Sequence, residues 1–247
     1  PDPNIMNSLQ GKISGMAINS SSVGVGGATR VVLRGNRSIS GDSQPLYVID
    51  GVPVNGSPQD LSADNIASIN VLKGPNAAAL YGSAAQNGVI VIETVQGRKG
   101  STSIDVNSTF MVNSPDFPLK FQNEYGQGSA GVFNPRTEFS WGPKLDGQMV
   151  DSWSLDPEKQ GTKVPYSAQP NNISDVFQDG HNSTSNVSIR SGGEKTQTAF
   201  SYTYRNVDGI IPNNNFRSHN ISLRVGNQLT KKLKIDSKVE YVNRVIY

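Results

Sequence analysis

Five segments after residue 100 alternate between apolar and polar side chains, and this pattern constrains the fold more than any other feature of the sequence. Side chains of a β-strand point alternately to opposite faces, so each segment predicts a strand with one apolar and one polar face. In residues 220–228, for instance, Ile221, Leu223 and Val225 alternate with polar residues. The five segments are residues 101–113, 186–191, 196–206, 220–228 and 233–241.

This alternation alone fits two architectures. A transmembrane β-barrel places apolar side chains toward lipid and polar ones toward a wet lumen, whereas a soluble sandwich reverses the two faces. The connections favour the barrel. Residues 192–195 and 229–232 form tight links, whereas 113–185 and 207–217 form long ones. Outer-membrane barrels alternate short periplasmic turns with longer external loops in this way. We therefore expect a long external loop at about residues 114–184.

A different pattern precedes these strands. Residues 67–73 alternate like a half-buried strand, and Gly74-Pro75 then ends it. Pro75 suits the first turn of a helix over the Ala-rich residues 75–81, and Gly82 suits its end. Residues 88–94 are a β-branched run, typical of a strand covered on both faces. With predicted strands at 28–34 and 46–49, the latter closed by an Asp50-Gly51 turn, the first 98 residues predict a small mixed α/β domain.

The composition narrows the possible functions. The chain has 247 residues, 35% of them hydrophobic, and its 22 basic and 20 acidic residues form no basic stripe that would indicate nucleic-acid binding. Cysteine is absent, which excludes disulfides and thiolate metal sites and suits passage through an oxidising compartment. No apolar run approaches the ~20 residues of a transmembrane helix. We expect the chain to be a fragment that lacks both ends, because it shows no signal peptide and stops inside a predicted strand.

Several motifs occur in the order typical of one family. They are LRGN at 33–36, PLYVIDGVPV at 45–54, LKGP at 72–75, ALYGS at 79–83 and NGVI at 87–90. The chain resembles a TonB-dependent outer-membrane transporter, and specifically the SusC/RagA family. The resemblance implies an α+β plug domain at 1–98, followed at 99–247 by about five antiparallel transmembrane strands, the first part of a plugged barrel of about 22 strands.

The resemblance also implies a function. A receptor of this kind sits in the bacterial outer membrane, in contact with its lipid, and imports a bulky nutrient such as a glycan or oligopeptide. It works with a SusD-like surface lipoprotein and takes its energy from TonB, driven by ExbB and ExbD. No TonB-box segment precedes Asn4, which we attribute to truncation. The alternatives are an unpaired siderophore-type transporter or a signal transducer of the same fold, and, in another class, a soluble β-rich binding module.

No arrangement of residues predicts an enzyme, a cofactor site or a metal site. His181 and His219 lack a carboxylate or nucleophile at a telling spacing, and the glycines at 24–27 do not match a phosphate-binding loop. We expect the functional residues to be contacts. Arg34, Arg37 and Lys73 are predicted to join the plug to the barrel wall. Contacts with the substrate or a lid protein are predicted for aromatic residues of the long loop, namely Tyr125, Trp141, Trp153 and Tyr166.

Overall fold

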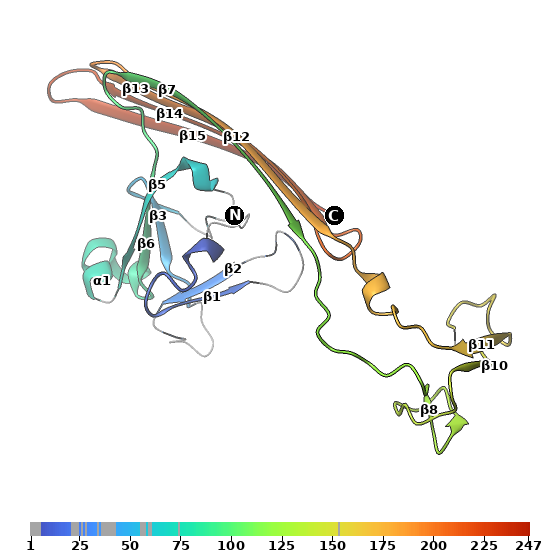
Figure 1. The fold of residues 1–247 in the computed structure, drawn as a ribbon. Helices are drawn as coiled ribbons and strands as arrows, with labels where there is room; N and C mark the ends of the chain where they lie inside the picture. Colours follow the sequence, from blue (N-terminus) through green and yellow to red (C-terminus); the bar gives the residue numbers. More distant parts are fainter. Residues whose placement is uncertain are drawn as a thin grey trace. The chain divides into compact units, whose positions relative to one another are not determined.

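The structure, a computed structural model, describes residues 6–20, 25, 27, 29–33, 35, 43–54, 58, 61–73, 75–152 and 154–247. They form two compact units (Figure 1). One unit comprises Pro1–Asn113 and Asp179–Tyr247, and the other comprises Ser114–Gln178. No helix among the described residues is long and apolar enough to cross a membrane.

Five long strands dominate the first unit. They form one antiparallel sheet in the order β15-β14-β13-β12-β7, which we call the wall sheet. Its strands are β7 (Ser101–Asn113), β12 (Gly180–Gly192), β13 (Thr196–Asp208), β14 (Asn215–Gln228) and β15 (Lys234–Ile246). The predicted antiparallel strands are confirmed. β12 begins six residues before the predicted segment, because the outward His181, Ser183 and Ser185 hide its alternation.

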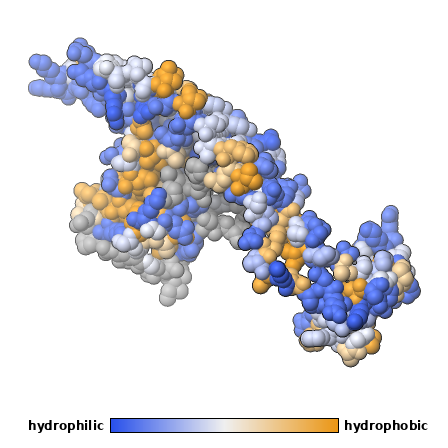
Figure 2. Space-filling model, viewed as in Figure 1, coloured by the Kyte–Doolittle hydropathy of each residue, from blue (hydrophilic) through white to orange (hydrophobic). Residues whose placement is uncertain are grey.

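The two faces of the wall sheet differ in chemistry. The side of the N-terminal domain carries buried polar residues such as Asn186, Thr203 and Arg224, which are 1%, 1% and 9% exposed. The opposite face carries apolar residues that remain in contact with solvent, among them Ile104 and Val106, which are 67% and 69% exposed. Figure 2 shows apolar side chains among polar ones along these strands. An apolar outer face with a polar inner face is the arrangement of a transmembrane barrel wall.

The N-terminal domain of the same unit contains two small sheets. The first pairs β1 (Met16–Ser20) with β2 (Thr29–Leu33), and the second has the order β4-β3-β6-β5. Its strands are β3 (Leu46–Ile49), β4 (Val52–Val54), β5 (Ile66–Leu72) and β6 (Val89–Thr94). β3 and β6 run parallel, whereas the other pairs are antiparallel.

Short helices complete this domain and confirm the strand-helix-strand prediction. Helix α1 spans Pro75–Tyr81, and Gly82 after it has φ +67°, the left-handed conformation expected at a helix end. The 3₁₀ turns are η1 (Asn7–Leu9), η2 (Ala63–Asn65) and η3 (Gly82–Ala85). Residues 7–15 contain the turn η1 and no longer helix, and β1 begins at Met16.

Strand β6 lies at the centre of the domain. Ile90 and Ile92 pack into one cluster with Met6, Ile18 and Val31, and Val89 packs into another on α1. Burial on both faces is what the β-branched sequence of this strand predicted. Gly88, just before it, has φ +95°, and a Cβ atom there would lie 2.7 Å from Leu33 Cδ1. The strand is therefore held firmly between both layers up to Thr94.

The second unit consists of loops and short strands. β8 (Gly128–Ser129) pairs with β9 (Val132–Phe133), and β10 (Asp146–Asp151) pairs with β11 (Lys163–Ser167). The 3₁₀ turn η4 covers Ser174–Val176. These strands were not predicted, since they are too short for alternation to stand out.

Candidate functional site

The turn between β3 and β4 presents a carboxylate to the wall sheet. Asp50 and Gly51 have φ values of 51° and 86°, so both central residues of the turn are left-handed, as Asp-Gly hairpin turns prefer. The Asp50 N–H donates to the Ile92 carbonyl at 2.9 Å, which ties the turn to β6. The Asp50 carboxylate accepts from the Thr94 N–H at 2.9 Å and from the Thr94 hydroxyl at 2.7 Å. The turn and the end of β6 therefore fix this carboxylate in place.

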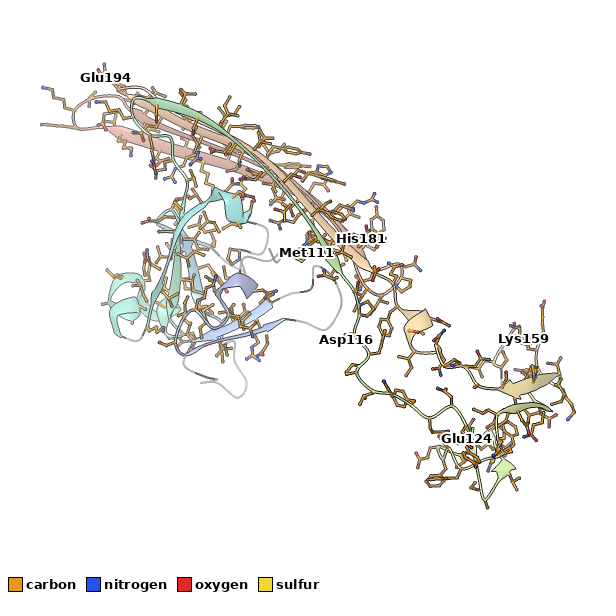
Figure 3. The ribbon with its side chains drawn as sticks, in the orientation of Figure 1. Met111, Asp116, Glu124, Lys159, His181 and Glu194 are labelled. Carbon is orange, nitrogen blue, oxygen red and sulfur yellow. The ribbon has the colours of Figure 1, made fainter. Side chains whose placement is uncertain are left out.

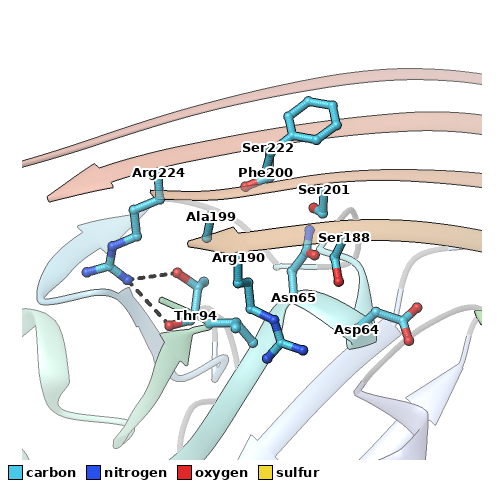
Figure 4. Close-up of a pocket in the computed structure, with 11 residues that line it drawn as sticks. Asp64, Asn65, Thr94, Ser188, Arg190, Ala199, Phe200, Ser201, Ser222 and Arg224 are labelled. Atoms are coloured by element: carbon cyan, nitrogen blue, oxygen red, sulfur yellow. Dashed lines mark hydrogen bonds between the residues drawn. The ribbon is translucent and has the colours of Figure 1, made fainter. Parts of the chain in front are cut away.

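Arg224 of β14 meets this carboxylate from the wall side. Its Nη1 donates to Asp50 Oδ1 at 2.7 Å and to the Thr94 hydroxyl at 3.0 Å. Its Nε and Nη2 donate to the two oxygens of Asp236 on β15, at 3.0 and 2.8 Å. The guanidinium is thus shared between a carboxylate of the N-terminal domain and one of the wall. Figure 4 shows Arg224 reaching from its strand to Thr94.

Three further side chains lie against this pair. Lys238 Nζ lies 3.6 Å from Asp50 Oδ2 and 3.2 Å from Glu240 Oε2. The Gln96 amide, turned so that its oxygen faces the guanidinium, accepts from both terminal nitrogens of Arg224 at 2.8 and 3.1 Å. We call the set of Asp50, Thr94, Arg224, Asp236, Lys238 and Glu240 the ionic contact. The side chains of Asp50 and Arg224 are only 13% and 10% exposed, so this contact is largely shielded from water.

These surroundings keep Asp50 ionised. Burial acts to raise the pKa of Asp50, but it is outweighed by the two hydrogen bonds from Thr94 and by the nearby positive charges of Arg224 and Lys238. The pKa of Asp50 consequently lies below its ordinary value. The carboxylate is therefore charged at neutral pH and attracts both cations of the wall.

A second contact between the domain and the wall contains no charged group. The Thr203 hydroxyl of β13 donates to Ser62 Oγ at 3.1 Å and accepts from Asn186 Nδ2 of β12 at 2.8 Å. We call these three residues the neutral contact. Ser62 is 0% exposed and the other two are each 1% exposed, so this contact is dry.

A small cavity of about 20 Å³, lined mainly by polar residues, lies beside the ionic contact and has room for about one water molecule. Asn65 and Thr94 line it from the N-terminal domain, and Ser201, Arg190 and Arg224 line it from the wall (Figure 4). Arg190 of β12 forms an ion pair with Asp105 of β7, within the wall. The boundary between domain and wall is thus polar along this stretch, unlike the apolar interior of the domain.

The structure places the predicted contact residues as follows. Arg34 and Arg37 lie outside the described residues. Lys73 Nζ donates to the backbone carbonyl of Ser14, a contact inside the N-terminal domain. Its predicted role toward the wall stays a prediction. Sequence reasoning put Asp50 in a turn and Arg224 on a polar strand face but did not connect them. A pair 174 residues apart gives no local signal.

The predicted aromatic residues of the long loop fall in the second unit. Trp141 is 72% exposed and Tyr125 is 38% exposed, with Lys144 Nζ 5.8 Å from the centre of the Tyr125 ring. Tyr166 instead packs edge-on against Phe133 and donates to the Gln127 carbonyl at 2.8 Å. Trp153 lies outside the described residues.

This unit also contains an open cavity of about 940 Å³, which Tyr125, Tyr166 and Gln127 help to line. Figure 3 shows its long loop, with Asp116, Glu124 and Lys159 labelled. Among the described residues, no group of three or more His, Asp or Glu side chains is placed to hold a metal ion.

Comparisons with known proteins agree with this geometry. The family model of the TonB-dependent receptor plug domain matches residues 1–89. The chain is 28% identical over 250 residues to the TonB-dependent receptor SusC of Bacteroides thetaiotaomicron, covering 97% of this chain and 23% of SusC. It is 26% identical to the TonB-dependent receptor P26 of Formosa agariphila, covering 98% of this chain and 23% of P26. The chain thus spans about a quarter of the length of these relatives.

Solved structures share the fold. A structure of the RagAB peptide transporter aligns with a TM-score of 0.76 at 20% identity, covering 99% of this chain and 29% of that one. The siderophore receptor PirA from Acinetobacter baumannii aligns with a TM-score of 0.55 at 16% identity, covering 100% of this chain and 30% of that one.

A mixed α/β domain held against the polar face of long antiparallel strands defines a class, the plugged barrels of the bacterial outer membrane. Within this class, residues 1–89 match the plug domain of TonB-dependent receptors, and the chain as a whole is similar in sequence to the TonB-dependent receptor SusC. The N-terminal domain is accordingly the plug, and the wall sheet is part of the barrel.

Proposed function

We propose that this chain supplies the plug and part of the barrel of an importer that carries a bulky nutrient, a glycan or an oligopeptide, across the outer membrane. TonB, energised by ExbB and ExbD, drives the transport, and a SusD-like surface lipoprotein captures the substrate. The relatedness to SusC and the shared fold with the RagAB peptide transporter support this proposal.

The observation that carries the proposal is the chemistry of the plug-wall boundary. An importer must displace its plug without unfolding the barrel, so its plug should be held by contacts that water can replace. Asp50 and Thr94 contact Arg224 through hydrogen bonds and charge, and most of the residues that line the cavity beside them are polar. Charged and polar groups regain water when such pairs separate, whereas an apolar interface would lose its whole hydrophobic stabilisation.

Several residues keep proposed roles within this function. Arg34, Arg37 and Lys73 serve as further contacts between the plug and the barrel. Tyr125, Trp141, Trp153 and Tyr166 serve as contacts with substrate or lipoprotein. The exposure of Trp141 and Tyr125 supports such a role for these two, since exposed aromatic side chains are frequent anchors of binding surfaces. Tyr166, which is engaged with Phe133 and Gln127, supports the loop that presents them.

Purification of the intact receptor from outer membranes tests the proposal. A tagged receptor is extracted in mild detergent, and the proteins that accompany it are identified by mass spectrometry. We expect a surface lipoprotein in stoichiometric amount and, in cells that lack the receptor, loss of growth on one glycan or peptide source. A barrel that purifies without a lipoprotein, from cells whose growth on these sources is unchanged, would contradict the proposal.

The second candidate is an unpaired siderophore-type transporter or a transducer of the same fold. The fold shared with the siderophore receptor PirA supports it. Uptake of a labelled iron chelate that depends on the receptor would favour this candidate. Unchanged chelate uptake, together with lost growth on a glycan or peptide, would favour the first.

A further inference from the structure

We propose that the wall side of the ionic contact is neutral by itself, and that this balance makes Asp50 a releasable counterion. Each wall cation of the contact has its own wall anion, and the plug carboxylate is added to a group that is already balanced. The proposal rests on the proposed function only in that the plug must be displaced during transport.

The pairing within the wall is the first support. Arg224 forms a two-pronged pair with Asp236, with both hydrogen bonds at or below 3.0 Å, whereas its link to Asp50 uses Nη1 alone. Lys238 lies closer to Glu240, at 3.2 Å, than to Asp50, at 3.6 Å. Within the contact, two cations and two anions of neighbouring strands therefore cancel without the plug, while the exposed Lys234 acts on Asp236 from outside the contact. The two-pronged geometry is the stronger arrangement for an arginine.

A second wall arginine repeats the arrangement. Arg190 lines the same cavity against the plug, and its carboxylate partner, Asp105, also lies on the adjacent wall strand. Both arginines bond diagonally across a strand pair, since the residues directly opposite them are Ser103 and Lys238. Diagonal neighbours on one face of a sheet are within reach of long side chains. Neither of these two arginines depends on the plug for a counterion.

This balance has a mechanical consequence. The wall anion Asp236 and the plug anion Asp50 both bind the Arg224 guanidinium, and they repel each other. This repulsion weakens the attraction between the wall and the plug. When the plug leaves, Arg224 keeps Asp236 and Lys238 keeps Glu240, so no wall cation is left without a partner. Asp50 carries its charge into water, where it is well solvated. The contact thus positions the resting plug and releases it at low cost.

Neutralising different acids of the same contact must then have opposite effects. Asp50→Asn removes the plug charge and loosens the plug. Asp236→Asn leaves the wall with one excess positive charge, which attracts Asp50 more strongly and tightens the plug. Glu240→Gln adds the same excess charge without removing a hydrogen bond of Arg224. It therefore shows whether the effect of Asp236→Asn comes from charge or from a shift of the arginine.

The Val25 backbone amide of the plug donates to Asn214 Oδ1, just before β14, at 3.1 Å. Hydrogen exchange of this amide in the intact receptor, without TonB or substrate, measures how often the plug separates from the barrel. We expect exchange about two- to fivefold slower in Asp236→Asn and Glu240→Gln, and faster by a similar factor in Asp50→Asn. Asp151→Asn, which removes an exposed acid paired with Lys163 in the second unit, is the matched control and should leave exchange unchanged.

Two results would overturn the inference. Faster exchange in all three variants would show that the acids only stabilise the plug, and unchanged exchange in Glu240→Gln would show that the wall charge does not act on Asp50. Because the measurement uses neither substrate nor lipoprotein, it separates this inference from the proposed function. A receptor that fails to import a glycan or peptide could still show the predicted pattern.

Discussion

The ionic contact and the neutral contact join the same two bodies, the plug and the wall, by different physics. The ionic contact combines charges on side chains that are 10–34% exposed, and it reaches across three strands and a turn. The neutral contact is a short chain of hydroxyl and amide groups, all at most 1% exposed. Charges attract each other over several ångströms and through water. Buried hydroxyl groups bind only at hydrogen-bond distance, so a small displacement of the plug breaks their bonds. The ionic contact therefore suits capture and release of the plug, and the neutral contact suits its exact seating.

The largest effect is expected from Arg224→Gln. The variant leaves Asp50 and Asp236 close together without the guanidinium that both of them bind. Removing one partner of a largely buried ion pair costs about 3 kcal/mol. We expect a much faster exchange of the Val25 amide, which donates to Asn214 Oδ1 across the boundary, and early release of the plug in urea. Unchanged exchange would show that the ionic contact does not hold the plug against the wall, which would contradict the distinction between the two contacts.

A smaller effect is expected from Thr203→Val. Valine has nearly the shape of threonine but leaves Asn186 Nδ2 and Ser62 Oγ without the shared hydroxyl. A lost buried hydrogen bond costs about 1–2 kcal/mol. Thermal unfolding of the intact receptor should show this loss at every salt concentration, because no charge is involved. Thr198→Val, on the outer face of the same strand, is the control and should have little effect. An equal loss of thermal stability in both variants would show that the buried hydroxyl contributes no more than an outer one.

Acid should weaken the ionic contact but not the neutral one. The pKa of Asp50 lies below its ordinary value, so its contribution is complete above about pH 4 and is lost as the pH falls through the lowered pKa. Arg224, Lys238, Asp236 and Glu240 also face this contact. We therefore compare wild type with Asp50→Asn. The difference in their melting temperatures should be constant from pH 7 to about pH 5 and shrink in more acidic solution. A difference that grows on acidification would contradict the assignment.

The smallest effect is expected in the second unit. Lys163 and Asp151 form an ion pair at 3.1 Å, but their side chains are 62% and 79% exposed. Exposed pairs of this kind contribute little, because water screens them. Asp151→Asn should leave the melting temperature of the receptor unchanged at low and high salt. A salt-dependent loss would show that exposure is a poor guide to the strength of ion pairs in this protein.

Much of the fold could be predicted from the sequence, because local patterns of apolar and polar residues indicate its strands. Alternation marked the wall strands, and the run at 88–94 marked a strand buried on both faces, as β6 is. Prediction failed where the pattern was weak. The N-terminal part of β12 has His181, Ser183 and Ser185 on its outer face. Strands β8 to β11 are too short to show alternation.

The candidate site could not be predicted in the same way. Asp50 was visible as a turn residue and Arg224 as a polar residue of a strand, but their contact depends on how the plug sits in the wall. The arginines and the lysine predicted for this role were chosen from the plug alone. The structure shows the reverse polarity at the described contact, with the anion on the plug and the cations on the wall. Only the three-dimensional fold brings these charges together.

The most direct test is a double-mutant cycle on Asp50 and Arg224 in the intact receptor, read by hydrogen exchange of the Val25 amide, which donates to Asn214 Oδ1 across the boundary. The central claim is that these two residues hold the plug through each other. We expect Asp50→Asn with Arg224→Gln to cost less than the sum of the single variants, with a coupling of about 0.5–1 kcal/mol. Additive effects would contradict the claim, because each residue would then act through other partners.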